Sequence, residues 1–180
     1  MAYLFSSERL GFRPWSRSDE EAFYQLNSNE SVMRHFPAPL SKEENIGLLE
    51  RLMQHQENHS FSFFAVEEIT SGQLVGMLGL IYTNLEEELG HIEVGWRLFP
   101  QYWGKGLATE GALRCLSFAF DEILAERVIA FCPAVNLASE MVMKRLGMSK
   151  VRNFTHPKLL NETRLKSCVL YQIMATEYSV

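Results

Sequence analysis

The sequence predicts a single domain of mixed α/β class. Its 180 residues are 47% hydrophobic and 22% charged, a composition typical of a globular protein with one sizeable core. Segments with the two-residue period of a strand are interspersed with segments that have the period and caps of a helix. No repeat, low-complexity tract or linker interrupts this pattern. We therefore expect one domain over residues 1–180, with its core at about 8–175.

The first third of the chain predicts one strand and two helices. Residues 10–15 read as a strand that Pro14 ends. Ser16 or Ser18 can cap a helix that runs to about Asn27, with acidic residues in its first turn. The prolines in 35–40 keep that segment extended. Ser41 and Glu44 form a capping box that opens a helix to about residue 57.

The remaining sequence predicts six strands and two helices. The strands are expected at 61–66, 74–83, 90–99, 127–132, 149–154 and 164–175. One helix is expected at 104–120, because almost all of its residues outside one polar stripe are apolar. The other helix is expected to begin after Asn136, a good cap, and to end at Gly147, where left-handed backbone is expected. The total is seven strands and four helices.

The charges are unevenly distributed along the chain. There are 17 Lys and Arg residues against 22 Asp and Glu, a net charge of −5, which argues against a nucleic-acid-binding protein. Residues 143–168 hold seven bases and one acid, so this segment carries +6 and the other residues −11. The basic segment is either a solvated face or a site for a polyanionic ligand.

The cysteines and the apolar segments limit the class of protein further. Cys115, Cys132 and Cys168 are odd in number and lack paired spacing, so we expect buried thiols and no metal site. The longest apolar run, 74–82, is too short to span a bilayer. The first residues do not have the pattern of a signal peptide. We expect a cytoplasmic protein with no membrane partner.

A glycine-containing turn between a strand and a helix is the most informative motif. Gly104 and Gly106 lack Cβ atoms, so the backbone N–H groups of the turn can approach a ligand closely. The helix N-terminus adds unpaired donors and a partial positive charge. Neither the Walker pattern nor the dinucleotide-binding pattern is present, because Gly106 follows Lys105 and Thr109 stands at the third glycine position. The turn predicts an anion site of another kind.

Five segments in order resemble one enzyme family. They are Arg34-His35-Phe36-Pro37-Ala38-Pro39-Leu40-Ser41 with Glu43-Glu44, Glu93-Val94-Gly95-Trp96, Tyr102-Trp103-Gly104-Lys105-Gly106, Asn136 to Met148, and Asn153 to Tyr171. Over about residues 8–175 the chain resembles the GNAT superfamily of acyl-CoA N-acyltransferases. The likeness is strongest to the branch of Rim-type ribosomal-protein N-terminal acetyltransferases.

The resemblance implies a fold and a co-substrate. The fold is a mostly antiparallel, seven-stranded sheet that splays into a V, flanked by about four helices. Acetyl-CoA would lie in the V, with its pantetheine arm along 94–98, its pyrophosphate on the turn, and no metal. Lys144 would meet a CoA phosphate, or else pair with Glu140 one helical turn away. The implied binding residues are Val94, Gly95, Trp96, Arg97, Leu98, Gln101, Tyr102, Trp103, Gly104, Lys105, Gly106, Leu107, Ala108, Thr109, Asn136, Ser139 and Lys144.

The implied reaction is direct attack by an amine on the thioester carbonyl. Backbone N–H groups near Trp96 and Arg97, freed by a bulge at Gly95, would stabilise the carbonyl oxygen. Glu93 is the candidate base, directly or through a water; the alternative is an ordinary surface glutamate. His91, on the same strand face, is a weaker candidate.

The leaving thiolate could take a proton from the enzyme. Much of the superfamily has a tyrosine seven residues after the helix-capping Asn, and here that residue is Met143. Ser139 is the hydroxyl that the Rim-type branch offers instead, unless it only satisfies the first helical turn.

The acceptor is left open among three possibilities. The branch and the acidic remainder of the chain favour the α-amine of a protein or peptide. A small amine such as a polyamine, an amino acid or an aminoglycoside is the second possibility. A non-catalytic acyl-CoA-binding regulator is the third. By analogy with the fold, the final strands could also form a homodimer.

Overall fold

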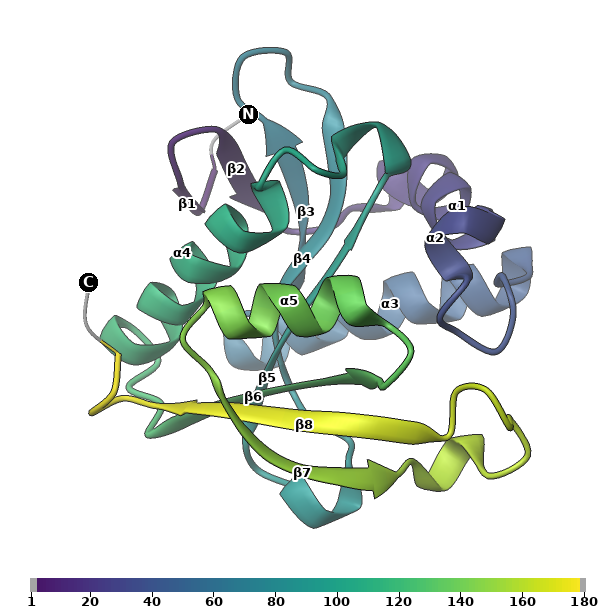
Figure 1. The fold of residues 1–180 in the computed structure, drawn as a ribbon. Coiled ribbons are helices and arrows are strands. Elements are labelled where there is room, and N and C mark those ends of the chain that lie inside the picture. Colours follow the sequence, from purple (N-terminus) through teal and green to yellow (C-terminus); the bar gives the residue numbers. More distant parts are fainter. Residues whose placement is uncertain (1–2, 179–180) are drawn as a thin grey trace.

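A computed structural model describes residues 3–178 as one eight-stranded sheet with helices on both faces (Figure 1). The strand order is β1-β2-β3-β4-β5-β6-β8-β7. The strands are β1 (Phe5–Ser6), β2 (Leu10–Arg13), β3 (Phe63–Glu68), β4 (Leu74–Tyr82), β5 (Ile92–Leu98), β6 (Arg127–Pro133), β7 (Ser149–Thr155) and β8 (Ser167–Met174). The α-helices are α1 (Glu20–Ser28), α2 (Glu30–Met33), α3 (Lys42–His59), α4 (Leu107–Asp121) and α5 (Leu137–Arg145). Short 3-10 turns are η1 (Arg17–Asp19), η2 (Glu86–Glu88), η3 (Pro100–Tyr102) and η4 (Pro157–Leu159).

The seven predicted strands and four predicted helices are all present, and two short elements are additional. β1 has two residues, paired with Gly11 and Phe12 of β2, and α2 is a four-residue helix that Asn29 caps. Neither is long enough to show a period in the sequence. Two of the predicted caps form: Ser41 and Glu44 make a capping box at α3, and Asn136 caps α5. The cap predicted at Ser16 or Ser18 is wrong for α1, because Ser16 precedes the 3-10 turn η1 and α1 begins after Asp19.

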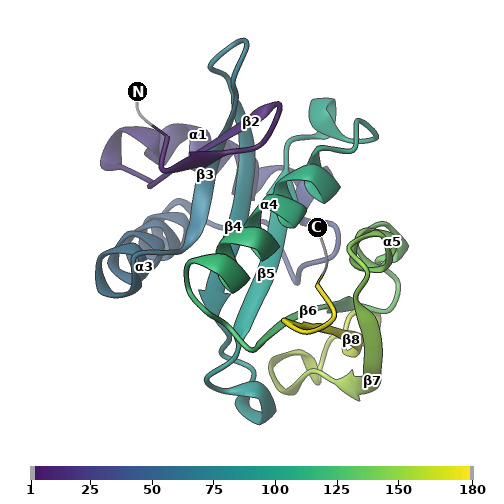
Figure 2. The ribbon, with the colours of Figure 1, turned by 90° about the vertical axis from the view of Figure 1, so that its left-hand side faces the viewer.

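The helices divide the interior into two layers. Figure 2 shows α3 and α4 on opposite sides of β3, β4 and β5. One apolar cluster joins α4 to the sheet through residues such as Leu78, Val94 and Leu116. The other joins α1 and α3 to the opposite face through Phe23, Leu52 and Met77. Because side chains alternate along a strand, neighbouring residues of β5 face different layers.

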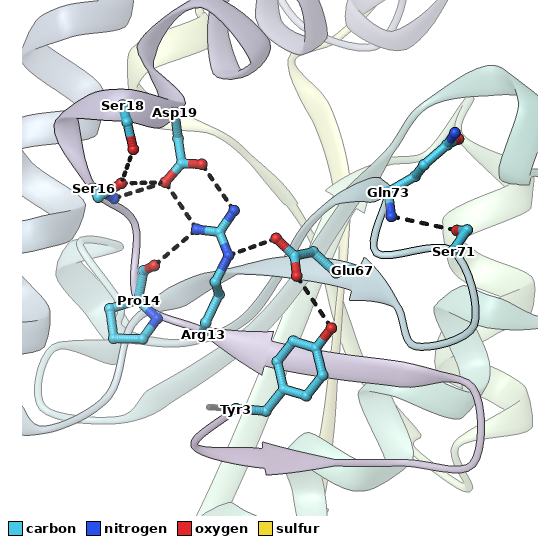
Figure 3. Close-up of polar contacts among 9 residues, drawn as sticks. All are labelled: Tyr3, Arg13, Pro14, Ser16, Ser18, Asp19, Glu67, Ser71 and Gln73. Carbon is cyan, nitrogen blue, oxygen red and sulfur yellow. Dashed lines mark hydrogen bonds and ion pairs between the residues drawn. The ribbon is translucent and has the colours of Figure 1, made fainter. Parts of the chain in front are cut away.

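An arginine between two carboxylates ties the first strand pairs to the start of α1 (Figure 3). Arg13 of β2 lies 2.8 Å from Asp19 and 2.6 Å from Glu67 of β3, and the side chains of all three are nearly buried. Burial alone would raise the pKa of Asp19, but hydrogen bonds from Arg13 and Ser16 outweigh it and hold that pKa below its ordinary value. Tyr3 completes the network by donating to Glu67.

The substitution Arg13→Gln should destabilise the fold by about 3 kcal/mol, because it leaves two nearly buried carboxylates without their cation. Arg17→Gln is the matched control, since Arg17 pairs with Glu50 on the surface, with side-chain exposures of 78% and 54%. Such an exposed pair contributes about 0–1 kcal/mol. The measurement is the free energy of unfolding in urea. Equal losses in the two variants would contradict the role given to Arg13.

Candidate active site

The sheet opens between β5 and β6. These two strands are parallel and pair only at Ile92 with Val128 and at Glu93 with Ile129. Beyond Glu93, β5 continues for five residues along β4 alone. The divergence leaves one edge of β5 without a partner strand, next to a cleft of about 900 Å³ that residues of β5, β6, α4 and α5 line. This is the splayed V that the resemblance implies.

One end of the cleft is the glycine turn. Gly104 and Gly106 have φ angles of +72° and +78°, which only glycine adopts without strain. Helix α4 begins directly after Gly106, and its first intrahelical bond runs from the N–H of Glu110 to Gly106. The preceding N–H groups of the helix, from Leu107 to Thr109, have no intrahelical acceptor and lie at the cleft. The turn therefore has the donors and the helix-end field that favour an anion.

The N-terminal hairpin holds the turn from outside. Arg9 donates to the carbonyl oxygen of Lys105 at 3.1 Å and pairs with Glu110 at 2.6 Å. Glu110 also accepts hydrogen bonds from the hydroxyl of Ser7 and from the backbone N–H of Arg9. Burial would raise the pKa of Glu110, but these contacts outweigh burial and lower it. A carboxylate fixed in this way links the first turn of α4 to the loop before β2.

Most of the predicted site residues line the cleft. They are Glu93, Val94, Gly95, Trp96, Arg97, Leu98, Tyr102, Trp103, Gly104, Gly106, Leu107, Ala108, Thr109, Asn136 and Ser139. Gln101, Lys105 and Lys144 are outside its lining. Lys105 lies over the ring of Tyr102, with its Nζ 5.4 Å from the ring centre. Gln101 is exposed in η3.

Lys144 forms an ion pair with Glu140 at 3.1 Å, which was the predicted alternative to contact with a CoA phosphate. Its neighbour Arg145 lines the cleft instead. Ala138, Val142 and Arg145, spaced by four and three residues, share a face of α5 at the cleft, whereas Lys144 is turned towards Glu140. This spacing was readable in the sequence and is the signal that would have found Arg145.

Glu93 lies in the cleft, apart from the acidic run of η2. Its side chain accepts a hydrogen bond of 2.9 Å from Thr83, and burial raises its pKa to about 7, even though that bond acts to lower it. Glu87 and Glu88, in contrast, pair with Arg152, and Glu88 also pairs with Arg127. His91 precedes β5 and is not part of the cleft lining. Glu93 is thus a carboxyl group that can take or give a proton near neutral pH.

Ser139, in the first turn of α5, lines the same cleft as Glu93. Its hydroxyl oxygen accepts a hydrogen bond of 3.0 Å from the Asn136 amide, and its N–H donates to the same side chain. Since the hydroxyl oxygen is the acceptor in that contact, its proton is left for another acceptor. Met143 is 1% exposed and packs in the core.

The predicted bulge at Gly95 is absent. β4 and β5 stay in continuous register from Gly76–Leu98 to Tyr82–Ile92. The reason for glycine at this position is a close contact, because a Cβ on Gly95 would come within 2.9 Å of the ring of Phe63. Backbone groups of β5 that do not bond to β4 face the cleft because β6 diverges, and not because the strand is bulged.

The charges at the cleft differ from those of the whole chain. Glu93 is its single carboxylate, whereas four cationic side chains belong to the lining: Arg34, Arg97, Arg145 and Lys158. The acidic surroundings expected for an arriving amine are therefore not found in this part of the described chain. Sequence reasoning had assigned only the backbone of Arg97, and it had not identified Arg34 or Phe36 as cleft residues.

Two general expectations concern membranes and metals. None of the described helices combines the length and hydrophobicity needed to cross a membrane. Within residues 3–178, no group of three or more His, Cys, Asp or Glu side chains is placed to hold a metal ion. The three cysteines are free and buried, as predicted.

Comparison with known proteins agrees with this geometry. The family described as "Acetyltransferase (GNAT) domain" matches residues 9–149. A GNAT-family acetyltransferase structure from Bacillus anthracis superimposes with a TM-score of 0.79 at 27% identity, covering 96% of this chain and 98% of that one. The Escherichia coli K12 spermidine N(1)-acetyltransferase is 24% identical over 96% of this chain and 92% of its own length. The Bacillus subtilis putative ribosomal N-acetyltransferase YdaF is 35% identical over 42% of this chain and 40% of its own.

The pKa of Glu93 predicts a pH-dependent gain of stability in Glu93→Gln. Because the folded pKa is about 7 and the ordinary value is 4.5, the charged carboxylate is disfavoured in the folded state. The wild type should therefore lose stability as the pH rises from about 4.5 to 7. At pH 8 the variant should be more stable by about 3 kcal/mol, and at pH 4 the two should be equal.

The measurement is the free energy of unfolding at both pH values. Glu122→Gln is the control, since Glu122 is exposed after the end of α4. A gain of the same size at pH 4 and pH 8 would show that burial of charge at Glu93 is not its cause.

Proposed function

This chain belongs to the GNAT family of acetyltransferases, and we propose that it transfers the acetyl group of acetyl-CoA to the α-amine of a peptide or protein N-terminus. The observation that carries the proposal is Glu93, a carboxyl group with a pKa of about 7 beside the unpaired edge of β5. Acetyl-CoA is the acyl donor of the family, and its acceptors are amines. The roles of individual residues below are part of the proposal.

The cleft suits acetyl-CoA at both of its ends. The turn from Tyr102 to Ala108 offers backbone donors for the pyrophosphate, and Arg145 adds a cation on the facing helix. The free edge of β5 from Val94 to Leu98 offers backbone groups to the amides of the pantetheine arm. N–H groups of the same edge near Trp96 are the proposed donors to the thioester oxygen.

Removal of a proton from the amine favours an α-amine as acceptor. Transfer of a proton from an α-ammonium, with a pKa near 8, to a carboxylate with a pKa of about 7 costs about 1.4 kcal/mol. The same transfer from a lysine ammonium, with a pKa near 10.4, costs about 4.6 kcal/mol. The pKa of Glu93 therefore suits removal of a proton from an α-ammonium group. The deprotonated amine can then attack the carbonyl carbon directly.

Collapse of the tetrahedral species breaks the carbon–sulfur bond and releases the CoA thiolate. Ser139 is the proposed proton donor to this sulfur, since its hydroxyl lies at the cleft and its oxygen accepts from Asn136. A thiol has an ordinary pKa near 8.5, so protonation adds little driving force at neutral pH. Ser139 therefore has a modest role, and Met143, buried in the core, has none.

The sequence leaves two other functions open. The likeness to a spermidine acetyltransferase keeps a polyamine acceptor as an alternative. The single carboxylate of the cleft lining offers little to a molecule with several positive charges, which argues against it. Membership of an acetyltransferase family supports an enzyme over a binding-only regulator.

The function is tested by thiol release from acetyl-CoA with peptides, polyamines and aminoglycosides as acceptors. We expect turnover with free N-terminal peptides and none with N-terminally blocked peptides. In Glu93→Gln, kcat/KM for the peptide should fall by about 10²–10³-fold, because the general base is lost. The wild-type profile should rise with pH through an inflection near 7 that the variant does not show. Turnover of polyamines and of no peptide would contradict the proposal that the acceptor is a peptide N-terminus.

A pair of neighbouring cations tests where CoA binds. Arg145→Gln should raise the KM for acetyl-CoA by about five- to tenfold, because it removes a cation from the cleft. Lys144→Gln should leave that KM within about twofold, because Lys144 pairs with Glu140 outside the lining. Initial rates at varied acetyl-CoA give both values. A larger effect at Lys144 would restore the assignment made from the sequence.

A further inference from the structure

The side chain of Arg97 is enclosed on the acceptor side of β5. Residues Val94 and Leu98 face α4, whereas Arg97 stands on the opposite face, in register with Met77 of the second cluster. Its guanidinium lies 4.2 Å from the centre of the Phe36 ring and donates to the side chain of Asn27. Burial lowers the pKa of Arg97 to about 10, which reflects a charge held away from water.

Two other partly buried arginines, Arg13 and Arg127, have carboxylate partners, and Arg97 does not. Arg13 lies between Asp19 and Glu67, and Arg127 pairs with Glu88. In residues 3–178, no carboxylate lies within the 4 Å of an ion pair with Arg97, and its Nε is buried without a hydrogen-bond partner. A buried cation is costly unless an anion accompanies it. Within the described residues the chain supplies only a neutral amide and an aromatic face, and the guanidinium lines the cleft, where an anion from outside can reach it.

Further cations surround the same part of the cleft. Arg34 lies over the Trp103 ring at 5.4 Å, and its carbonyl oxygen accepts a hydrogen bond from Arg164 of the loop before β8. Burial and the charges of Arg34 and Arg164 lower the pKa of His35. None of these arginines forms an ion pair within the described residues. Arg34, which contacts the glycine turn through Trp103, and Arg97 on the opposite face of β5 therefore add positive charge to the cleft, and this charge attracts anions.

The position of Arg97 separates it from the phosphates of CoA. The glycine turn and the N-terminus of α4 belong to the opposite face of the sheet. The partners of Arg97 come from α1 and from the loop between α2 and α3. Those segments lie on the face of β5 that Arg97 shares with Glu93, to which the acceptor amine must come. An anion at Arg97 is therefore a group of the acceptor.

We propose that Arg97 binds a carboxylate carried by the acceptor, so that the enzyme selects amines that bear an acidic group. The inference rests on the function proposed above and names the acceptor class for the same cleft. Glu93 and Arg97 are four residues apart on one strand face, about 13 Å at about 3.3 Å per residue. An amine at Glu93 and a carboxylate at Arg97 are then separated by several bonds. This spacing fits an Asp or Glu side chain at the second position of a peptide better than one at the first position, whose carboxylate is only a few bonds from the amine.

The wild-type enzyme provides the first test. Thiol release is measured with tetrapeptides that differ only at position 2, carrying Glu, Gln or Lys, and with free glutamate. We expect kcat/KM for the Glu peptide to exceed that for the Gln peptide by about 10–100-fold, and the Lys peptide to be poorest. Added salt should reduce the preference, because it screens the charges. Preference for free glutamate over all of the peptides would support carboxylate binding at Arg97 and overturn the peptide acceptor.

Substitution of Arg97 provides the second test. In Arg97→Gln the Glu-to-Gln peptide ratio should fall to within about twofold of one, and Arg97→Lys should restore part of it. The ratio is independent of any general loss of activity, and Gln removes a buried charge without adding volume, so the fold should tolerate it. Arg145→Gln is the matched control in the same cleft. It is expected to raise the KM for acetyl-CoA and to leave the Glu-to-Gln peptide ratio unchanged.

The failures of the two proposals are distinguishable. No thiol release with any amine would remove the proposed function. Turnover of peptides with equal or better use of Gln and Lys peptides would overturn only the role of Arg97. A raised KM for acetyl-CoA in Arg97→Gln, with the acidic preference intact, would also overturn it and place Arg97 on the donor side.

Discussion

The two-residue parallel contact between β5 and β6 is the constraint on which the site depends. If the pairing continued along β5, its backbone groups would be satisfied by the neighbouring strand and no cleft would exist. Because it stops at Glu93, five residues of β5 present a free edge in the middle of a sheet. The glycine turn and the first turns of α4 and α5 lie along the same opening. Binding of a substrate that mimics a strand would complete what the fold leaves unpaired.

Sequence reasoning recovered the elements and the motif well, because their signals are local. The Ser41–Glu44 capping box, the Asn136 cap and the glycines with positive φ each depend on a few adjacent residues. The errors concern relations that no local pattern encodes. The explanation of Gly95 required knowledge that the Phe63 ring packs against it from two strands away. Prediction of the charge of the cleft required knowledge that the fold brings Arg34 and Arg97 together, although they are 63 positions apart in the chain.

Glu93 and Arg97 show how one strand can serve two opposite electrostatic purposes. Both side chains are half-buried on the same face of β5, and burial disfavours the charged form of each. For the carboxyl group, the consequence is a pKa near the working pH, as a proton acceptor requires. For the guanidinium, whose pKa stays far above neutrality, the consequence is a retained charge that lacks a counterion. An overall charge of −5 says nothing about either effect, since both depend on local burial.

The contacts of Arg9 bear on what the glycine motif is. Arg9 fixes the carbonyl oxygen of Lys105 and the carboxylate of Glu110, so the geometry of the turn is set in part by a residue about a hundred positions upstream. The glycine motif is consequently not sufficient to form the turn when it is moved to another protein. A segment containing the strand, the turn and α4, grafted onto another scaffold, would carry every glycine and still lack the clamp that shapes the turn. Extensions or deletions before β2 act at the donor site, although they are remote from it in sequence.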